Sequence, residues 1–393
     1  MGRKVVIAGS CRTALGKMGG SLANIPAVQL GAVVIREALT RAGVDPKDVD
    51  MVYMGCVLQA AQGQNPARQA AIKAGLPNTT PALTVNVVCG SGLEAVNMAA
   101  RLVAMGEADV VVAGGMENMS AAPYALNQAR YGYRLGDGKI VDTMVNDGLW
   151  DAFGQYHMGI TAENVASQWH LSRTELDEFS LLSQQKAAKA QAEGRFESEI
   201  VPVELKVKKE TILFKEDEGI RGDSTIEALS KLRPAFKDDG VITAGNASTI
   251  NDGAAAVVVM SAEKAAELGI QAEVEWLGGA LAGVDPAIMG IGPVPATRKA
   301  LARAGWSIAD LDAVELNEAF ASQSLACIRD LDLNADIVNA DGGAIALGHP
   351  LGSSGTRLVI TLLGRLERAD AKRGLATMCV GVGQGSALLL ERP

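Results

Sequence analysis

Aromatic residues and positive charge are both scarce in this chain of 393 residues. Phe, Trp and Tyr make up 4% of the sequence, and the formal net charge is −9 at pH 7. An acidic chain without a basic block is unsuited to nucleic acid as its main partner, although a few local cations can still hold an anionic ligand. The 48% of hydrophobic residues and the 44 glycines exclude intrinsic disorder and are typical of an α/β protein with close helix–sheet packing.

Long apolar runs and metal-ligand spacings are also missing. No uninterrupted apolar stretch is long enough to span a bilayer, and no secretory or transit peptide precedes the strand that we predict at residues 4–8. The cysteines are odd in number and lack metal-ligand spacing, which indicates free thiols in a reducing compartment. We therefore expect a cytoplasmic protein that contacts no membrane. The five cysteines are Cys11, Cys56, Cys89, Cys327 and Cys379.

An internal repeat organises the chain. Residues 38–52 and 300–314 are offset by 262 positions, and eight of the fifteen aligned residues are identical. At the same offset Gly90 aligns with Gly352, and each of these glycines precedes an apolar run with helical spacing. Such self-similarity predicts two halves of similar build, related by duplication.

Each half reads as a helix, a buried strand, a second helix and a closing strand. The alternation predicts parallel sheets that are covered on both faces. The expected fold class is therefore α/β, with two similar mixed or parallel-sheet halves around a shared central helix layer. The strands are expected at 49–56, 109–113, 311–316 and 375–380.

Residues 120–247 break this rhythm. They contain a predicted helical stretch at 161–194 and a charged segment at 206–223. We interpret them as an inserted loop domain that covers a ligand; the alternative is an insertion without a function. The chain then divides into an N-terminal half of residues 1–119 continued by about 248–271, the loop domain at 120–247, and a C-terminal half of residues 272–393.

Two segments predict a nucleophile and its base. Cys89 precedes Gly90 at an expected helix start, where backbone N–H groups and the helix dipole stabilise a thiolate; the alternative is a packed structural cysteine. His349, one of only three histidines, precedes the helix that the repeat pairs with the Cys89 helix. If a pseudo-twofold axis relates the halves, imidazole and thiol face each other as a Cys–His pair. The alternative is a structural histidine in a glycine loop.

Two further segments add polar groups to this expected site. Cys379 follows a buried strand and lies two residues before Gly381, so a second thiol is available for proton transfer and glycine N–H groups for an oxyanion. Asn317 ends the strand expected at 311–316, where polar residues often line a site; the alternative is a helix cap. Together these segments indicate a site with two thiols and one imidazole.

These segments resemble the motifs of the thiolase family. The matching motifs lie at residues 86–92, 317–321, 342–350 and 379–385. Residues 156–164 are similar to the loop-domain segment of short-chain acetoacetyl-CoA thiolases, and 232–236 and 245–248 to the family's CoA-contacting region. The resemblance extends over essentially the whole chain. It implies an acyltransferase that condenses two acetyl-CoA reversibly to acetoacetyl-CoA and CoA.

The resemblance also implies roles for the reactive residues. Cys89 forms an S-acyl intermediate, and His349 takes its proton. Cys379 removes a proton from the second acetyl-CoA, whose enolate oxygen is held by His349 and by a water on Asn317. The N–H groups of Cys89 and Gly381 hold the other oxyanion. Coenzyme A thioesters are the substrates, and neither a metal nor another cofactor is required.

The family's binding residues carry over in the same way. Ser248 is expected on the pantetheine arm of CoA and Arg221 near its nucleotide. Met158 lies over the acyl site, where its bulk favours acetyl and acetoacetyl groups. His157 either shapes the acyl pocket or packs as a simple structural histidine. The other expected wall residues are Leu149, Phe236, Ala244, Met289 and Phe320.

Members of the family are dimers or tetramers, so a homo-oligomer is expected. By the resemblance, Glu117 and Asn118 belong to the region packed between subunits. Four positions depart from the family's pattern and bear on substrate detail more than on reaction class: Ala14, Thr249, Asp341 and Val382.

Three alternative functions remain open from the sequence. A 3-ketoacyl-CoA thiolase of fatty-acid degradation would have the same chemistry and a wider acyl pocket. A decarboxylating ketoacyl synthase shares the doubled fold, but the second cysteine speaks against it. A non-catalytic acyl- or lipid-binding relative typically lacks a reactive residue, whereas Cys89, Asn317, His349 and Cys379 are all present here.

Overall fold

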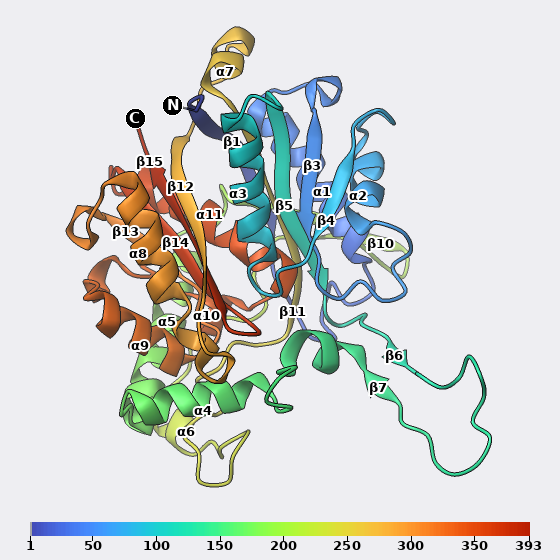
Figure 1. The fold of residues 1–393 in the computed structure, drawn as a ribbon, viewed down its shortest axis with the longest axis vertical. Coiled ribbons are helices and arrows are strands. Elements are labelled where there is room, and N and C mark those ends of the chain that lie inside the picture. The colour runs from blue at the N-terminus through green and yellow to red at the C-terminus, as the bar shows by residue number, and fades with distance from the viewer. Residues whose placement is uncertain (1) are drawn as a thin grey trace.

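The computed structural model describes residues 2–393 and joins the strands of both halves in one mixed sheet (Figure 1). The order is β13–β14–β15–β12–β1–β11–β5–β3–β4, with the short β2 on β11 and β8 on β1. β1 and β12 connect the halves through the antiparallel pairs Val6–Glu275 and Ile7–Val274. The strands are β1 (Val5–Thr13), β2 (Gly16–Lys17), β3 (Met51–Gly55), β4 (Ala82–Val85), β5 (Val110–Asn118), β8 (Ile200–Val201), β11 (Asn251–Ser261), β12 (Val274–Gly283), β13 (Ala313–Leu316), β14 (Arg373–Val380) and β15 (Gln384–Glu391).

The strand pairing is less parallel than the alternation predicts. Only β3–β4, β3–β5, β13–β14 and the short β1–β8 contact are parallel. A turn of three residues, 381–383, joins β14 to β15, and so short a connection forces antiparallel neighbours. β11 returns from the long insertion and pairs antiparallel with β1 and β5. The alternation thus predicted more parallel pairing than the sheet has, whereas the expected α/β fold with mixed halves is confirmed.

The predicted central layer is formed by the two duplicated helices. α3 (Ser91–Ala104) packs against α11 (Leu351–Arg368), and both share one hydrophobic core with strands of the two halves. Alternate residues of β1 point to opposite faces, so that Val5 and Ile7 join this core while Val6 and Ala8 pack toward α1 (Ala27–Ala42). At the offset of 262 residues β3 corresponds to β13, α3 to α11 and β5 to β14, so the duplication extends to the structure.

The remaining helices cover the two halves. α1 packs against α2 (Pro66–Ala74) in the N-terminal half, and α8 (Pro293–Ala304) packs on β12 and β15 in the C-terminal half. α9 (Ala321–Leu331) follows the motif around Asn317, and α10 (Ala344–Leu347) lies just before His349. The short elements are η1 (Pro46–Asp48), α7 (Ala262–Leu268), η3 (Pro286–Ile291), η4 (Ile308–Asp310) and η5 (Ala335–Ile337).

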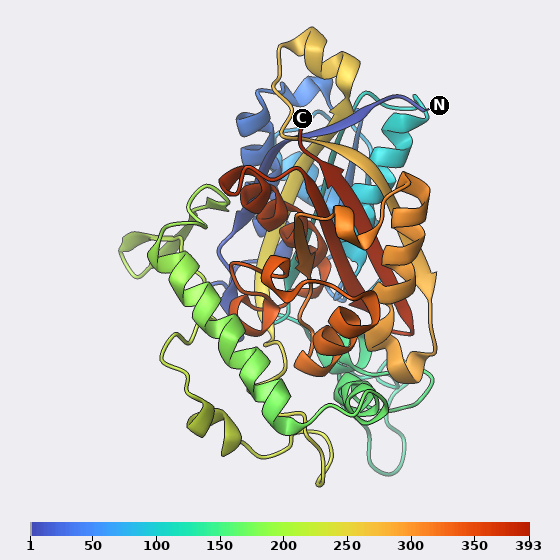
Figure 2. The same ribbon diagram turned by 90° about the vertical axis from the view of Figure 1, so that its left-hand side faces the viewer.

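The inserted segment, residues 120–247, forms two helices where one helical stretch was expected at 161–194. α4 (Met158–Gln168) and α5 (Arg173–Ala192) are separated because Ser172 caps α5 in a capping box with Glu175. Figure 1 shows α4 and α6 below the sheet and the β6–β7 arm projecting away from the body, and Figure 2 shows the long α5 along one side. The smaller elements are β6 (Tyr124–Ala125), β7 (Val141–Asp142), η2 (Val145–Leu149), β9 (Val203–Val207), β10 (Glu210–Phe214) and α6 (Ile226–Ser230).

Within residues 2–393, no helix combines the length and apolar character needed to cross a bilayer. The same residues contain no cluster of His, Cys, Asp and Glu arranged to hold a metal ion. All five cysteines are buried and free.

Candidate active site

A cavity of about 670 Å³ lies where both halves meet the inserted segment. It brings together residues that are far apart in the sequence, and most of the expected site residues line it. Those residues are Cys89, Leu149, His157, Met158, Arg221, Phe236, Ala244, Ser248, Met289, Phe320 and His349. Asn317, Cys379 and Gly381 do not line the cavity themselves but lie directly behind its wall, as the contacts below describe.

Cys89 lies immediately before α3 and is 9% exposed. Val88 before it has a positive φ of 44°, an unusual conformation for a β-branched residue, and Gly90 after it begins the helix. Burial raises the pKa of Cys89 to about 11, although the backbone N–H groups of Gly381 and of Cys89 itself act to lower it. Burial thus outweighs the stabilisation that the helix start predicts for a thiolate, and the resting residue is a neutral thiol.

His349 is held from three directions. Its backbone N–H donates to Asn251 Oδ1 at 3.1 Å, and its Nδ1 lies 2.7 Å from Ser354 Oγ. Nε2 lies 3.4 Å from Asn317 Nδ2. Burial, followed by the charge of Arg357, lowers the pKa of His349 to about 3, so the imidazole is neutral. The ring is fixed in place with Nε2 toward the reactive groups.

Ser354 is one turn into α11, and its hydroxyl suits either neutral form of the imidazole. Its Oγ lies 2.9 Å from the carbonyl oxygen of Pro350. When Nδ1 of His349 carries the proton, Ser354 accepts from it and donates to Pro350. When Nε2 carries the proton, the hydroxyl rotates and donates to Nδ1. A proton can therefore arrive at and leave Nε2 without loss of a hydrogen bond at Nδ1.

Asn317 and Cys379 complete the polar end of the cavity. Asn317 ends β13 with a fully buried side chain, and its Oδ1 has no partner within the described residues. Cys379 is fully buried near the end of β14. Burial raises the pKa of Cys379 well above its ordinary value, and a charge on Cys89 raises it further because the two sulfurs are close. The N–H of Gly381 and the sulfur of Cys379 thus lie close to Cys89, and Asn317 lies beside Nε2 of His349.

Aromatic and sulfur-containing side chains form the apolar wall. The His157 ring stacks on Phe236 with centroids 4.6 Å apart, and Phe320 meets Phe236 edge-on at 6.3 Å. His157 Nδ1 accepts the N–H of Gly159 at 3.1 Å and so caps α4, while burial lowers the pKa of its ring. These contacts make His157 a neutral wall residue that packs and caps at once.

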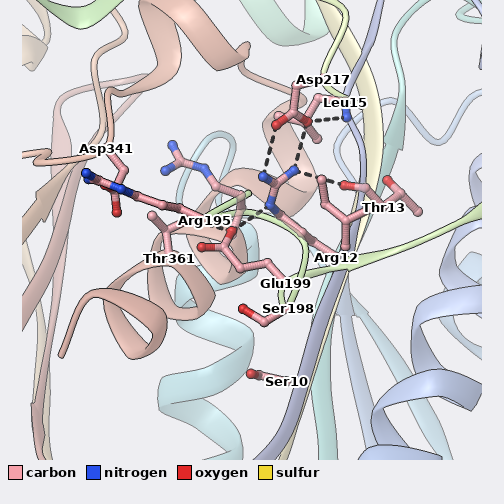
Figure 3. A network of polar contacts seen from close by, with 12 residues as sticks. Ser10, Arg12, Thr13, Leu15, Arg195, Ser198, Glu199, Asp217, Asp341 and Thr361 are labelled. Atoms are coloured by element: carbon pink, nitrogen blue, oxygen red, sulfur yellow. Dashed lines mark hydrogen bonds and ion pairs between the residues drawn. The ribbon is translucent and has the colours of Figure 1, made fainter. Parts of the chain in front are cut away.

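Buried ion pairs hold the segment that forms the cavity mouth (Figure 3). The Arg12 guanidinium donates to Asp217 through two nitrogens at 2.8 and 3.0 Å and to Glu199 through Nε at 2.9 Å. All three side chains are buried. Because Asp217 directly precedes Glu218 and lies four residues before Arg221, which both line the cavity, the network ties β1 to the mouth.

Glu117 and Asn118, which the resemblance assigns to a region packed between subunits, form hydrogen bonds inside the chain. Glu117 is fully buried and accepts three backbone N–H groups, among them that of Gly352 at 2.8 Å. The Asn118 side-chain amide donates to the carbonyls of Leu22, Ala23 and Ile25. Their polar atoms are thus committed within one subunit, and the expected place of this region in a subunit interface stays a prediction.

The four departures from the family's pattern fall into distinct surroundings. Thr249 Oγ1 donates at 2.7 Å to Asn251 Oδ1, the same atom that holds the backbone of His349. Asp341 is paired with Arg195 at 2.5 Å and with Arg368, away from the cavity lining (Figure 3). Val382 has a positive φ of 62°, which explains why glycine suits this turn. Ala14 is fully buried beside the mouth network.

Several cavity residues escaped the sequence reasoning. Lys17 and Met18 follow β1, and Glu218 lies in the charged segment, so their common location depends on tertiary structure alone. Ser354 lies four residues after the motif at 342–350, but only the phase of α11 distinguishes it from Ser353. The further lining residues that the sequence did not indicate include Met119, Gly148, Thr243, Ile250 and Leu351.

Comparison with known proteins places this geometry in a family. Residues 5–263 match the thiolase N-terminal domain and residues 268–392 the thiolase C-terminal domain. The chain is 57% identical to an acetyl-CoA acetyltransferase of Chromobacterium violaceum, over 99% of this chain and 100% of the relative. It is 58% identical to one of Pseudomonas aeruginosa, over 99% of both chains.

Solved structures agree with this assignment. The Bacillus anthracis acetyl-CoA acetyltransferase superposes with a TM-score of 0.98 at 45% identity, covering 100% of this chain and 99% of that one. Human mitochondrial 3-ketoacyl-CoA thiolase superposes with a TM-score of 0.97 at 42% identity and the same coverage. With two matched domains, high identity and a shared fold over its full length, the chain belongs to the thiolase family.

Proposed function

We propose that this chain is an acetyl-CoA acetyltransferase, which condenses two acetyl-CoA to acetoacetyl-CoA and CoA and catalyses the reverse thiolysis. The observation that carries the proposal is that Cys89 and His349 line a single cavity, with Cys379 close behind Cys89 and Asn317 beside Nε2 of His349. Relatives at 57–58% identity bear the same name, which supports this function over the longer-chain alternative.

The first half of the reaction transfers an acetyl group to Cys89. The thiol proton passes to His349 Nε2 while the sulfur attacks the thioester carbonyl. Because burial keeps Cys89 protonated and His349 neutral, proton transfer and attack are coupled and no stable ion pair forms first. The N–H groups of Cys89 and Gly381 hold the oxyanion, and CoA leaves with the proton from His349.

The second half forms the carbon–carbon bond. Cys379 first gives its proton to Nε2 of His349, and the resulting thiolate then takes a proton from the methyl group of the second acetyl-CoA. The enolate oxygen is held by the Nε2–H of His349 and by a water on Asn317. The enolate carbon attacks the S-acetyl carbonyl, the bond to Cys89 Sγ breaks, and acetoacetyl-CoA forms. The proton on Nε2 of His349 then passes to the Cys89 thiolate, which restores both thiols and the neutral imidazole.

The cavity also accounts for the proposed binding of CoA. Ser248 lines it beside the Ala319 carbonyl, to which its N–H donates at 3.0 Å, and is assigned to the pantetheine arm. Arg221 and Lys17 supply positive charge at the mouth for the phosphates. Residues 120–247 contribute much of the wall, which supports their role as a loop domain that covers CoA.

The proposed preference for short acyl groups rests on the apolar wall. Met158, Met289 and Phe320 are all less than 9% exposed and line the same cavity as Cys89. A hydrophobic wall of this kind discriminates chain lengths by steric exclusion of the longer substrate. Acetoacetyl-CoA is therefore the proposed substrate of thiolysis.

The decisive experiment measures cleavage of acetoacetyl-CoA by free CoA in the wild type and in Cys89→Ala, beside a 3-ketoacyl-CoA of hexanoyl length. We expect activity on the short substrate only and its complete loss in the variant. Equal rates on both substrates would support the longer-chain thiolase. Binding of CoA without cleavage of either substrate would refute catalysis and favour a binding protein.

We further propose that the protein is a cytoplasmic homo-oligomer, a dimer or a tetramer, active in fatty-acid metabolism. The support for assembly is the β6–β7 arm, which projects from the body in Figure 1 and exposes Tyr131 by 86% and Leu135 by 99%. Apolar side chains this exposed are typical of contact surfaces. Light scattering on the wild type and on the double variant Tyr131→Ser, Leu135→Ser tests this, and we expect the variant to form smaller particles.

A further inference from the structure

The duplication places a carboxylate where the active site has its second thiol. At the offset of 262 residues Glu117 of β5 corresponds to Cys379 of β14, and Cys56 corresponds to Glu318. Cys379 lies beside the residues that start α3. Glu117 lies beside the residues that start α11, the helix that the repeat pairs with α3. The proposed mechanism assigns Glu117 no role.

Glu117 joins three chain segments through one carboxylate. Its Oε2 accepts the N–H of Val57 at 3.0 Å and the N–H of Gly352 at 2.8 Å, while Oε1 accepts that of Leu58 at 3.1 Å. The side chain is 0% exposed. The carboxylate thus links the end of β5, the loop after β3 and the first turn of α11, where a negative charge also complements the helix dipole.

The first turn of α11 is packed so closely against β5 that it cannot shift toward the strand. A Cβ on Gly352 would lie 2.8 Å from Glu117 Oε2, and a Cβ on Gly115 would lie 1.9 Å from the Gly352 carbonyl oxygen. The backbone of this turn therefore touches β5 directly. His349 lies three residues before Gly352, and Leu351 lies directly before it. Both His349 and Leu351 line the cavity.

We propose that Glu117 is a positioning residue of the active site, which fixes the first turn of α11 and through it the location of the His349 imidazole relative to Cys89. This inference rests on the proposed function. Displacement of a catalytic group by about 1 Å costs on the order of a hundredfold in rate, so a hydrogen-bond clamp on the adjoining turn has a direct effect on turnover. Burial raises the pKa of Glu117 to about 7, and the three N–H groups oppose that rise.

The test is the isosteric variant Glu117→Gln. Its amide keeps one oxygen for Gly352 and Val57 but turns an NH₂ toward the N–H of Leu58, so the carboxylate clamp is lost with little change in volume. We expect kcat for thiolysis of acetoacetyl-CoA to fall by about tenfold to a hundredfold, while KM for both substrates stays within about threefold. Iodoacetamide should still label Cys89 alone, because the other four buried thiols remain protected.

A matched control and a second variant keep the inference falsifiable. Glu273→Gln removes another carboxylate that accepts hydrogen bonds from Ser10, in a region that does not line the active-site cavity, and should leave kcat unchanged. If Glu117→Gln does not fold, Glu117→Asp provides the test, since it keeps the charge but shortens the reach of the carboxylate to Gly352.

An unchanged kcat in the folded variant overturns the positioning role of Glu117 and leaves the proposed function intact. A rise in KM as large as the fall in kcat, or labelling of all five thiols, assigns Glu117 to general stability and also overturns its positioning role. A wild type that does not cleave acetoacetyl-CoA refutes the proposed function itself.

Discussion

His349 Nδ1 lies 2.7 Å from the hydroxyl of Ser354, five residues further along the chain and one turn into α11. This contact keeps the imidazole oriented while Nε2 gains and loses a proton. Asn251 holds the backbone of the same residue from β11. The base of the proposed reaction is thus supported by one strand of the N-terminal half and by the central helix.

Replacement of Ser354 by Ala should impair catalysis more than substrate binding. Without the hydroxyl, Nδ1 loses its partner in both neutral forms, and a buried unpaired nitrogen costs about 1–3 kcal/mol. We expect kcat to fall by roughly tenfold to a hundredfold with KM little changed, as measured by steady-state thiolysis. Ser353→Ala is the matched control, because Ser353 Oγ contacts only the Pro350 carbonyl, at 3.3 Å. Equal kcat in the two variants would contradict the role of Ser354.

The reaction of Cys89 with iodoacetamide should rise steeply with pH. Because burial raises the pKa of Cys89 to about 11, the thiolate fraction of the resting enzyme is small at pH 7 and increases about tenfold per pH unit up to that value. The labelling rate should therefore still be rising at pH 9, where an ordinary exposed thiol has begun to level off. Mass spectrometry of the labelled peptide provides the measurement. A plateau by pH 8 would show that the N–H groups of Gly381 and Cys89 outweigh burial.

The sequence indicates the reactive groups of this site better than it indicates their supports. Cys89, His349 and Cys379 stand in glycine-rich motifs because a reacting carbonyl needs backbone without bulky side chains around it. These glycines can be recognised in the sequence. Ser354 and Ser353 look equivalent in the sequence, since only the phase of α11 turns one hydroxyl toward the imidazole. The hydrogen bonds of Glu117 could not be predicted because its partners are backbone N–H groups, which no sequence displays.

The strands show the same contrast between features that the sequence indicates and features that depend on tertiary structure. Hydrophobic runs located β3, β5, β13 and β14 to within a few residues, because burial dictates their composition. The antiparallel return of β11 depends on where the inserted segment re-enters the sheet, and periodicity carries no information about direction. Parallel pairing was therefore overestimated, although the duplicated arrangement followed from the repeat.

The Arg12 network should contribute strongly to stability. Arg12→Leu leaves Asp217 and Glu199 buried without their cation, and loss of one partner of a buried ion pair typically costs about 3–5 kcal/mol. We expect the free energy of unfolding in urea to fall by that amount. The segment that contains Glu218 and Arg221 should also loosen and raise KM for CoA. Lys4→Leu, which removes an exposed ion pair with Glu275, should change stability by less than about 1 kcal/mol.

Replacement of Val382 by Gly should stabilise the protein. Val382 adopts a positive φ of 62° in the turn between β14 and β15, and a left-handed conformation costs a β-branched residue about 1–2 kcal/mol or more. Glycine adopts this φ freely but loses more chain entropy on folding, about 0.5–1 kcal/mol, so a net gain of roughly 1 kcal/mol is expected. Thermal unfolding followed by circular dichroism measures the gain as a higher Tm. Val380→Gly, two residues earlier in ordinary strand conformation, should lower Tm because it removes a buried side chain and adds only flexibility. If both variants lower Tm, contacts of the Val382 side chain outweigh its backbone strain.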